Sequence, residues 1–204
     1  IAQGNWFYNN TPIISLEKLQ EYYINSVGLN AVALINVAPN TEGLIDTQSV
    51  SRLREFKDWV DQLAQNDLTR GENVKITADS RRGNSPGYSP ENLIDGNYDT
   101  YYAAADSIKK VTIEIDLGQP ALIEGVVLQE YIPLGQRVSE YTLECFDGNQ
   151  WFEVASQQTI GYKRLIMGES PETHGKAFPL TQKIRLNIHD SRACTLLNTL
   201  GVIN

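Results

Sequence analysis

Three consecutive aromatic residues near the start of the chain are its best candidates for binding a small ligand. Trp6, Phe7 and Tyr8 follow Gly4 and Asn5, and an extended segment of this kind presents ring faces on both sides. Aromatic faces pack on the apolar C–H patches of sugars, and they also pack in hydrophobic cores. We expect Phe7 in a core, whereas Trp6 could equally line a pocket or pack in a core.

A compact turn at residues 92–100 could hold a metal ion. Asp95, Asn97 and Thr100 bring oxygen atoms together there, and a hard cation such as Ca²⁺ requires about six to eight oxygen ligands. The spacing of an EF-hand is absent, however, and an Asp-Gly turn also satisfies its own main chain with its side chains. Both interpretations stay open.

No arrangement of residues in this chain predicts a self-contained active site. The nucleophile-elbow, P-loop, HExxH and dinucleotide-binding patterns are absent. The histidines, His174 and His189, lie far apart in sequence and fit surface or turn positions. Any two of the 25 acidic residues could in principle form the carboxylate pair of a glycosidase, so composition cannot select one.

The composition is that of an ordinary globular protein. Of the 204 residues, 41% are hydrophobic and 21% are charged, which excludes a disordered tail, a collagen-like repeat and a disulfide-dense mini-protein. The net charge is −8, and an acidic surface repels phosphate backbones, so nucleic acid is not expected as a partner. The longest apolar run, 31–37, is far too short to span a membrane.

The two cysteines, Cys145 and Cys194, allow one disulfide, but the sequence does not show whether they meet. Cys145 shares one face of an expected strand with Tyr141 and Leu143, which favours a buried thiol. Because no CxxC pair exists, neither a zinc site nor a redox motif is indicated.

The first third of the chain has the pattern helix, strand, helix. Ser15 is an N-cap candidate and Gly28 ends the first helix. Residues 31–37 are almost entirely apolar, as in a strand that is buried on both faces of a parallel sheet. Asp46 or Thr47 then caps the second helix. The apolar faces of the two helices consist of Leu16, Leu19, Tyr22, Tyr23 and Val27, and of Val50, Leu53, Phe56, Val60 and Leu63.

This α/β piece is too small to fold alone. One buried strand with two amphipathic helices cannot cover its own apolar faces, because a parallel strand needs a neighbour on each side. The piece must therefore be the end of a larger domain, or it must dock on a partner.

The periodicity changes after Asp67. The stretch 69–73 is polar and typical of a linker, and from Val74 onward apolar residues recur with a period of two. Residues 111–117 and 184–188 alternate strictly. Further short runs occur at 123–129, 141–146, 151–155 and 159–165. Many short strands separated by turns predict an antiparallel sandwich of about 130 residues, which divides the chain into residues 1–70 and 71–204.

Several segments of the second part resemble the discoidin-like domains in the order of that family. These domains are also called coagulation factor 5/8 type C domains, and they include carbohydrate-binding module family 32. The resemblance implies an all-β jelly-roll sandwich with binding loops at one end, and many members of the family are lectins for terminal galactose or related sugars. The segments are 92–100, 115–118, 141–144, 147–151 and 191–193.

A narrower resemblance points to bacterial α-L-fucosidases of glycoside hydrolase family 29. In the sandwich, segments 128–130, 134–137 and 159–164 are similar to the version of the domain that follows the catalytic barrel in that family. The helical part independently resembles the end of that barrel, and its Trp-Phe-Tyr run is similar to the branch that acts on α-1,3 and α-1,4 fucosyl linkages. The implied fold class is a C-terminal α/β fragment of a (β/α) barrel followed by the sandwich. The matching segments of the helical part are 4–8, 23, 26–30 and 34–43.

The fucosidase resemblance implies a retaining glycosidase whose Asp nucleophile and Glu or Asp acid/base flank the fucosyl bond. Both carboxylates lie upstream of Gly4, so we predict that this chain begins within the barrel, holds no catalytic residue and is inactive alone. Trp6 matches a family aromatic near the substrate pocket. Asn36 ends the expected last barrel strand, where barrel enzymes keep their sites, although it could equally be a buried polar group that a neighbouring main chain satisfies.

In the sandwich, the resemblance implies a calcium site made by Asp95, Asn97 and Thr100 with a Glu near the C-terminus. Residues 198–201 are Asn-Thr-Leu-Gly, so that anion is missing and the affinity of the site falls. Calcium is thus a candidate structural ion, and catalysis requires no cofactor. For a sugar site we name Tyr88, Tyr102 and Tyr131, because we expect these side chains to be exposed.

The sequence therefore predicts the C-terminal portion of a secreted bacterial enzyme that removes terminal α-linked L-fucose from glycans. Its implied partners are fucosylated glycans and the upstream barrel of the same protein, and its implied location is periplasmic or extracellular. The alternative is a stand-alone discoidin-type lectin without catalysis. In a third interpretation the sandwich only braces the barrel.

Overall fold

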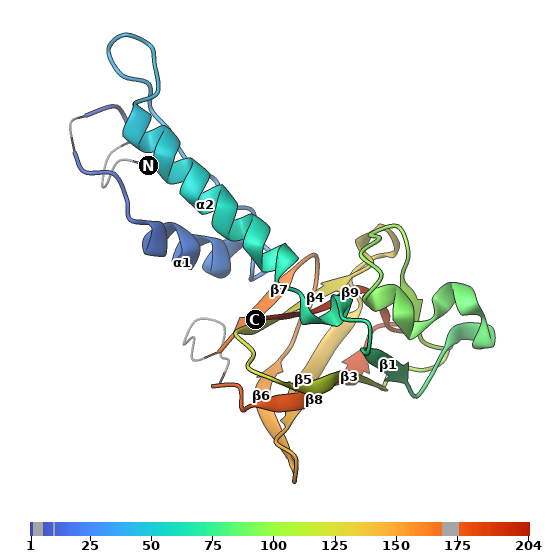
Figure 1. Cartoon of the computed structure of the whole chain (residues 1–204). Coiled ribbons are helices and arrows are strands. Elements are labelled where there is room, and N and C mark those ends of the chain that lie inside the picture. The colour runs from blue at the N-terminus through green and yellow to red at the C-terminus, as the bar shows by residue number, and fades with distance from the viewer. Residues whose placement is uncertain (2–5, 10, 169–175) are drawn as a thin grey trace.

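The structure is a computed structural model that describes residues 1, 6–9, 11–168 and 176–204. Two helices with extended segments come first, and a two-sheet β-sandwich follows (Figure 1). The C-terminus lies where the two parts meet, and the Asn204 main-chain N–H donates to the Asn66 carbonyl there at 3.3 Å.

Helices α1 (Leu16–Ser26) and α2 (Thr47–Gln65) confirm the two predicted helices. The Ser15 hydroxyl accepts the Lys18 main-chain N–H at 3.2 Å, as an N-cap does. Asp46 is the N-cap of α2. None of the helices in the described part of the chain combines the length and the apolar composition needed to cross a membrane.

Aromatic rings join the two helices. Tyr23 of α1 meets Phe56 and Trp59 of α2 edge-on, with ring centroids 5.9 and 5.6 Å apart. Each such pair contributes about 0.5–1.5 kcal/mol beyond the burial of its area. Leu19 of α1 is buried, whereas every residue of α2 keeps some exposure. The helix pair therefore depends on this cluster rather than on a deep core.

Within the described residues the segment 31–37 pairs with no strand, so the prediction of a strand buried on both faces is wrong. Val32 is 90% exposed and Leu34 is 85% exposed. A strand exists only when its main-chain groups bond to neighbouring strands, and the residues that the structure describes offer this segment no such neighbour. Its apolar side chains therefore remain exposed to solvent.

The sandwich confirms the predicted antiparallel architecture. One sheet has the order β1-β3-β8-β5-β6 and the other the order β2-β9-β4-β7. The strands are β1 (Lys75–Ala78), β2 (Tyr102–Ala103), β3 (Val111–Ala121), β4 (Gly125–Glu130), β5 (Val138–Phe146), β6 (Trp151–Gln157), β7 (Arg164–Met167), β8 (Thr181–Ser191) and β9 (Leu196–Ile203). Short 3₁₀ helices lie between the elements: η1 (Leu68–Arg70), η2 (Arg82–Asn84), η3 (Pro86–Tyr88), η4 (Pro90–Leu93) and η5 (Ile132–Leu134).

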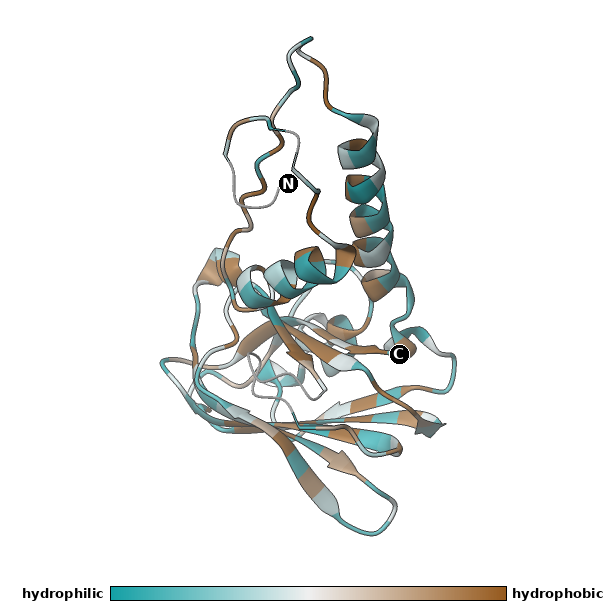
Figure 2. Ribbon diagram, turned by 90° about the vertical axis from the view of Figure 1, so that its left-hand side faces the viewer, coloured by the Kyte–Doolittle hydropathy of each residue, from teal (hydrophilic) through white to brown (hydrophobic). Residues whose placement is uncertain are grey.

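The predicted alternation is confirmed along β3 and β8. Ile113 and Ile115 are fully buried between the sheets, and Glu114 and Asp116 face outward. Figure 2 shows the same alternation of hydrophobic and hydrophilic residues along the strands. The run 159–165 was misplaced, because β7 begins only at Arg164.

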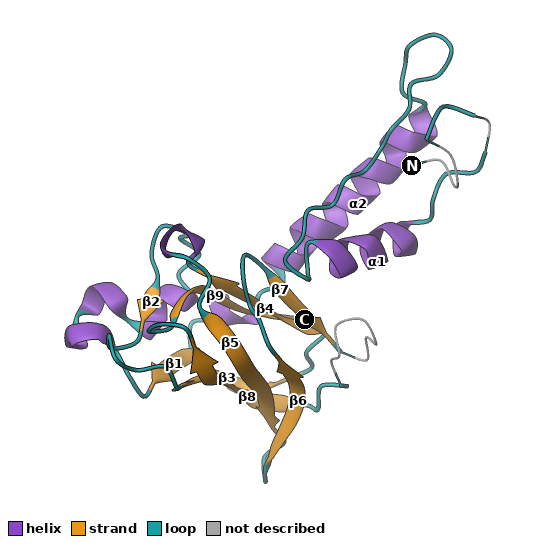
Figure 3. Ribbon diagram, turned by 180° about the vertical axis from the view of Figure 1, so that it is seen from behind, coloured by secondary structure: helices purple, strands orange, loops and turns teal. Residues whose placement is uncertain are grey.

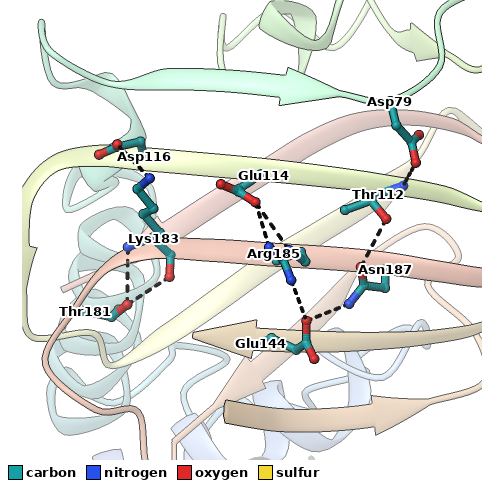
Figure 4. A network of polar contacts seen from close by, with 9 residues as sticks. All are labelled: Asp79, Thr112, Glu114, Asp116, Glu144, Thr181, Lys183, Arg185 and Asn187. Carbon is teal, nitrogen blue, oxygen red and sulfur yellow. Dashed lines mark hydrogen bonds and ion pairs between the residues drawn. The ribbon is translucent and has the colours of Figure 1, made fainter. Parts of the chain in front are cut away.

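Polar contacts cover the outer face of the five-stranded sheet (Figure 4). The Arg185 guanidinium lies 3.1 Å from a carboxylate oxygen of Glu114 and 3.6 Å from one of Glu144. It also lies 3.7 Å from the ring centroid of Trp151, so it covers a face of that ring. One face of the Trp151 ring is therefore already covered by Arg185. The ion pairs between neighbouring strands are typical of a sheet face that is exposed to solvent.

Glu130, at the end of β4, is a buried carboxylate that holds three main-chain donors. It is 2% exposed. Its Oε1 accepts the N–H groups of Arg137 at 2.6 Å and Val138 at 2.9 Å, and its Oε2 accepts the N–H of Gly161 at 2.7 Å. These bonds attach the segments that lead into β5 and β7 to the end of β4.

The two cysteines are free and buried. Burial raises the pKa of the Cys145 thiol to about 12, so this side chain behaves as a core residue, as predicted.

We expect Glu130→Ala to lower the free energy of unfolding by about 3 kcal/mol or more, because three buried N–H groups lose their acceptor. Urea denaturation of the chain measures this. Glu140→Ala, which removes an exposed carboxylate nearby, should change it by no more than about 0.5 kcal/mol. Equal effects of the two substitutions would contradict the role given to Glu130.

Candidate functional site

Side chains that could bind a ligand or a partner are grouped in three places. The first is the N-terminal segment beside α2. The second is the loop end of the sandwich, formed by the loops around 79–101, 131–137 and 191–195, of which the first lies on the side away from α1 and α2 (Figures 1 and 3). The third is the junction, where the helical part meets the sheet that contains β4, β7 and β9.

In the N-terminal segment, Asn36 bonds to the main chain at Trp6. Its Nδ2 donates to the Trp6 carbonyl at 2.6 Å, so the amide is used by the protein itself. The Trp6 side chain is 63% exposed, and Phe7 is 81% exposed. The prediction that Phe7 packs in a core is therefore wrong here, because no described layer covers this segment. Gly4 and Asn5 lie outside the described residues.

A cavity of about 300 Å³ lies beside the same segment. Tyr8, Ala38 and the first residues of α2 line it, whereas Trp6 and Asn36 do not. The structure thus brings Trp6 and Asn36 together, but a pocket role for either stays a prediction.

At the loop end, tyrosine rings form a stack. Tyr101 lies parallel to Tyr131, with centroids 4.2 Å apart, and Tyr88 tilts against Tyr101 at 5.5 Å. All three side chains are half-buried. Burial and a hydrogen bond with Tyr88 raise the pKa of the Tyr101 hydroxyl, so it stays a neutral donor. Two of the three predicted tyrosines therefore lie in one cluster, and sequence reasoning missed Tyr101.

The prediction of an exposed Tyr102 is wrong. Tyr102 is fully buried, and its hydroxyl donates to the Ser80 carbonyl at 2.5 Å. Burial raises the pKa of this hydroxyl. Tyr101 lies just before β2, is half-buried and stacks on Tyr131, whereas Tyr102 is the first residue of β2 and is buried together with Ala103. The sequence alone does not distinguish the two adjacent tyrosines.

Two arginines that sequence reasoning also missed border the tyrosines. Arg82 lies 5.2 Å from the ring centroid of Tyr88, and its guanidinium lies 2.6 Å from an Asp106 carboxylate oxygen. Arg82 and Arg137 both donate to the sulfur of Cys194, at 3.1 and 3.0 Å. The loop end thus combines ring faces with guanidinium donors.

The predicted calcium residues lie together in their turn. Asp95 accepts the Asn97 main-chain N–H at 2.7 Å and the Thr100 hydroxyl at 2.6 Å, and that hydroxyl also lies 2.8 Å from the Asn97 carbonyl. Asn198 approaches the turn from β9, since its Nδ2 donates to the Tyr98 carbonyl at 3.4 Å. Its Oδ1 is buried without a hydrogen-bond partner.

The turn contains few negatively charged groups, which argues against a bound metal ion. Over the described residues, no three His, Cys, Asp or Glu side chains are grouped so that they could hold a metal. The Arg70 guanidinium donates to the Ile94 carbonyl at 2.6 Å and lies against Gly96. Calcium binding here stays a prediction.

At the junction, the chain after α1 joins the edge strand β7. The Leu165 N–H donates to the Gly28 carbonyl at 2.9 Å, and Leu29 forms an isolated bridge with Arg164. The Asn30 side chain accepts the Tyr162 N–H at 2.6 Å. The helical part is therefore hydrogen-bonded to the sheet as an additional short strand would be.

A second contact follows α2, where the sequence predicted a linker. Asp67 accepts the N–H groups of Thr69 and of Val202 in β9, each at 3.0 Å, and pairs with Ile203. Thr69 is 2% exposed. Thr69, the first residue of the predicted linker, is therefore held in place, because its N–H and hydroxyl donate to Asp67, which in turn accepts the Val202 N–H of the sandwich.

Comparison with known families identifies the class of protein. Residues 75–195 match the model of the family described as F5/8 type C domain, and residues 1–65 match the family described as Alpha-L-fucosidase. The first match covers more than half of the chain, so the chain belongs to the F5/8 type C domain family. The segments 92–100 and 141–144, which resembled the discoidin-like domains, both lie inside this match.

Two related proteins are named as α-L-fucosidases. The "Putative alpha-L-fucosidase 1" of Oryza sativa subsp. japonica is 31% identical over 199 residues, which cover 97% of this chain and 36% of that protein. "Alpha-L-fucosidase 1" of Arabidopsis thaliana is 30% identical over 164 residues, which cover 79% of this chain and 32% of that protein. The chain thus spans about a third of the length of these relatives.

Solved structures agree in arrangement. A Ruminococcus gnavus GH29 fucosidase in complex with fucose matches with a TM-score of 0.88 and 30% identity, over 98% of this chain and 39% of that one. A putative α-L-fucosidase from Bacteroides thetaiotaomicron matches with a TM-score of 0.87 and 28% identity, over 98% of this chain and 43% of that one. In this chain the segment that matches the Alpha-L-fucosidase family, 1–65, precedes the F5/8 type C domain.

We expect Asn30→Gly to loosen the junction at Tyr162. Asn30 has a φ of 68°, so glycine fits the backbone and only the acceptor is lost. Hydrogen exchange at the Tyr162 amide should accelerate roughly fivefold, for a hydrogen bond of about 1 kcal/mol. Asn84→Gly, at an exposed asparagine with a φ of 52°, is the matched control and should leave that amide unchanged. Unaltered exchange in Asn30→Gly would show that the bond does not hold the junction.

Proposed function

We propose that the protein to which this chain belongs is an α-L-fucosidase that hydrolyses terminal α-linked L-fucose from glycans by a retaining mechanism. The supporting observation is that one continuous structure contains both family matches in the order found in a fucosidase solved with fucose, at a TM-score of 0.88 over 98% of the chain. In this proposal the catalytic carboxylates lie upstream of Trp6. Trp6 lies beside the substrate, and Asn36 holds the main chain that carries it.

The open apolar segments support an upstream barrel as the partner of this chain. Trp6, Phe7, Val32 and Leu34 expose large apolar side chains in the helical part, and the Asn36 side chain joins the two segments that carry them. Exposed apolar groups of this extent mark an interaction surface. A barrel strand beside 31–37 would bond to its main chain and cover these side chains.

The junction supports a bracing role for the sandwich. Main-chain bonds to Gly28 and the bond from Val202 to Asp67 connect the sandwich to the helical part at two separate places. A flexibly tethered lectin would need neither contact. The sandwich therefore stabilises the last elements of the barrel, and this observation favours the enzyme over the stand-alone lectin.

A sugar-binding role of the sandwich rests on the tyrosine cluster at the loop end. Tyr88, Tyr101 and Tyr131 provide ring faces, and Arg82 provides a donor next to them. Fucosylated glycans are the proposed partners. We also propose a secreted bacterial enzyme with a jelly-roll sandwich that acts in the periplasm or outside the cell, which the likeness to bacterial fucosidases supports.

We expect the full-length protein to hydrolyse an aryl α-L-fucoside and this chain alone to show no activity. Release of the aryl alcohol measures both. The control is the full-length protein with its candidate nucleophilic Asp replaced by Asn, which should lose activity. Hydrolysis by this chain alone would refute the upstream position of the carboxylates, and an inactive full-length protein that binds glycans would favour the lectin.

We further propose that the turn at 95–100 binds calcium weakly through Asp95, Asn97, Thr100 and Asn198. The converging oxygens and the unpartnered Asn198 Oδ1 support this. The proposed site has one carboxylate, that of Asp95, and the positively charged Arg70 guanidinium lies near it. Both features keep the affinity for calcium low, with a dissociation constant of about 10⁻⁴–10⁻³ M.

Calcium at about ten times that constant should stabilise the chain by about 1.4 kcal/mol. Thermal unfolding in calcium and in EDTA measures the shift. Asp95→Asn should abolish it, whereas Asp147→Asn, in the other exposed Asp-Gly-Asn turn, should preserve it. A wild-type chain that unfolds at the same temperature in calcium and in EDTA would refute the site.

A further inference from the structure

One asparagine organises the loop that precedes α2. The Asn40 N–H donates to the Leu44 carbonyl at 2.7 Å. The side-chain Oδ1 of Asn40 accepts the N–H groups of Glu42 at 2.9 Å and of Leu44 at 3.0 Å, and its Nδ2 donates to an Asp46 carboxylate oxygen at 3.2 Å. Asp46 is the N-cap of α2. Residues 40–46 therefore form a closed loop that is attached to the start of the helix, and we call it the Asn40 loop.

The Asn40 loop exposes two large apolar side chains. Leu44 is 60% exposed and Ile45 is 47% exposed. The turn before them passes through Gly43, which has a φ of 79° that glycine adopts readily, and the Gly43 N–H donates to the Asn40 carbonyl at 3.0 Å. Because these bonds restrict the main chain, the loop presents both side chains in a defined arrangement and loses little further entropy when it binds a ligand.

The Asn40 loop lies at the end of α2 that is remote from the sandwich (Figures 1 and 3). This helix has 19 residues and is therefore about 28 Å long. The sandwich is bonded to the chain just beyond the other end of the helix, at Asp67. The described part of the sandwich thus leaves Leu44 and Ile45 uncovered.

The N-terminal segment lies beside the Asn40 loop. The Asn36 Nδ2 donates to the Trp6 carbonyl at 2.6 Å, and Asn36 precedes Asn40 by only four residues. Tyr8, two residues after Trp6, and Asp46, at the end of the loop, line the same cavity of about 300 Å³. The segment that carries Trp6 and the Asn40 loop are therefore neighbours.

In the proposed enzyme, the Asn40 loop belongs to the connection between the barrel segment 31–37 and the helix that follows it. The connections that follow barrel strands surround the active site, at the end of the barrel toward which the strands run. The chain runs from 31–37 through the Asn40 loop into α2, which places the loop at that end. Trp6, which we propose to lie beside the substrate, is at the same end.

An enzyme that removes a terminal sugar encloses that sugar, and the rest of the glycan extends outward from the pocket. A loop at the rim of the pocket therefore meets the group to which the fucose is attached. Aliphatic side chains such as Leu44 and Ile45 pack on the apolar C–H patches of a sugar ring. Thr41 and Glu42, exposed on the same loop, place polar groups beside them, and a ligand site combines both kinds of group.

We propose that the Asn40 loop selects the group to which fucose is attached, with Leu44 and Ile45 in contact with that group and Asn40 as the residue that positions them. The partner of the two aliphatic side chains is the second sugar of the glycan, which packs on them with its C–H face. This inference rests on the proposed fucosidase activity and adds a determinant of its specificity.

The test compares two substrates of the full-length protein that differ in the leaving group. One is α-L-fucosyl fluoride, which carries no second sugar. The other is the fucosylated trisaccharide, with an α-1,2, α-1,3 or α-1,4 linkage, that the wild-type protein hydrolyses fastest. L44A/I45A should lower the ratio of kcat/KM for the trisaccharide to kcat/KM for the fluoride about tenfold, because contacts with the second sugar are lost. Asn40→Ala should lower the same ratio, because two loop N–H groups lose their acceptor.

Two further variants serve as controls. Leu122→Ala removes a leucine that is 67% exposed between β3 and β4 of the sandwich, and it should leave the ratio unchanged. Leu44→Met keeps an apolar side chain of similar volume and should retain most of the ratio. Thermal unfolding of every variant shows whether the substitution affects folding.

The outcomes separate the specificity of the loop from the activity itself. A wild-type protein that hydrolyses neither substrate would refute the fucosidase, whereas one that hydrolyses only the fluoride would overturn the role of the loop alone. An unchanged ratio in L44A/I45A would also overturn that role. Equal losses on both substrates, or a double variant that does not fold, would show that Leu44 and Ile45 pack within the enzyme instead of on the glycan, and the proposal would be wrong.

Discussion

The sandwich depends on one buried carboxylate at the end of β4. Glu130 accepts main-chain N–H groups from the start of β5 and from Gly161, just before β7. Burying a charge is costly unless hydrogen bonds compensate it, and three donors do so here. The first of these segments adjoins the tyrosine stack, and the second meets Asn30 at the junction. One side chain therefore holds the loop end and the junction in a fixed relation.

The junction and the loop end differ in the groups that they present. At the junction, bonds to Gly28 and Asp67 make the sandwich a continuation of the helical part. Among the described residues, the helical part gives 31–37 no neighbouring strand, so its apolar side chains stay exposed. The loop end carries the tyrosine cluster and the Arg82 and Arg137 guanidinium groups instead. The proposed enzyme and glycan partners thus contact the chain in separate places.

The sequence predicted best those strands that have one face exposed to solvent. β3 and β8 were predicted because a sheet with one solvated face imposes a period of two. β9 was not predicted, because it is buried along most of its length and shows no alternation. The stretch 69–73 was predicted as a linker, although Thr69 is buried: side chains that bond to another segment have the same residue types as side chains that bond to water.

By itself, the sequence determined the two helices, the sandwich and the order of the two family motifs, because local periodicity and turn chemistry encode them. Only the tertiary structure decided that Tyr101 joins Tyr88 and Tyr131 while Tyr102 enters the core and bonds to Ser80. It also decided that Arg82 and Arg137 meet at Cys194. Such contacts join residues far apart in the chain, and no local pattern records them.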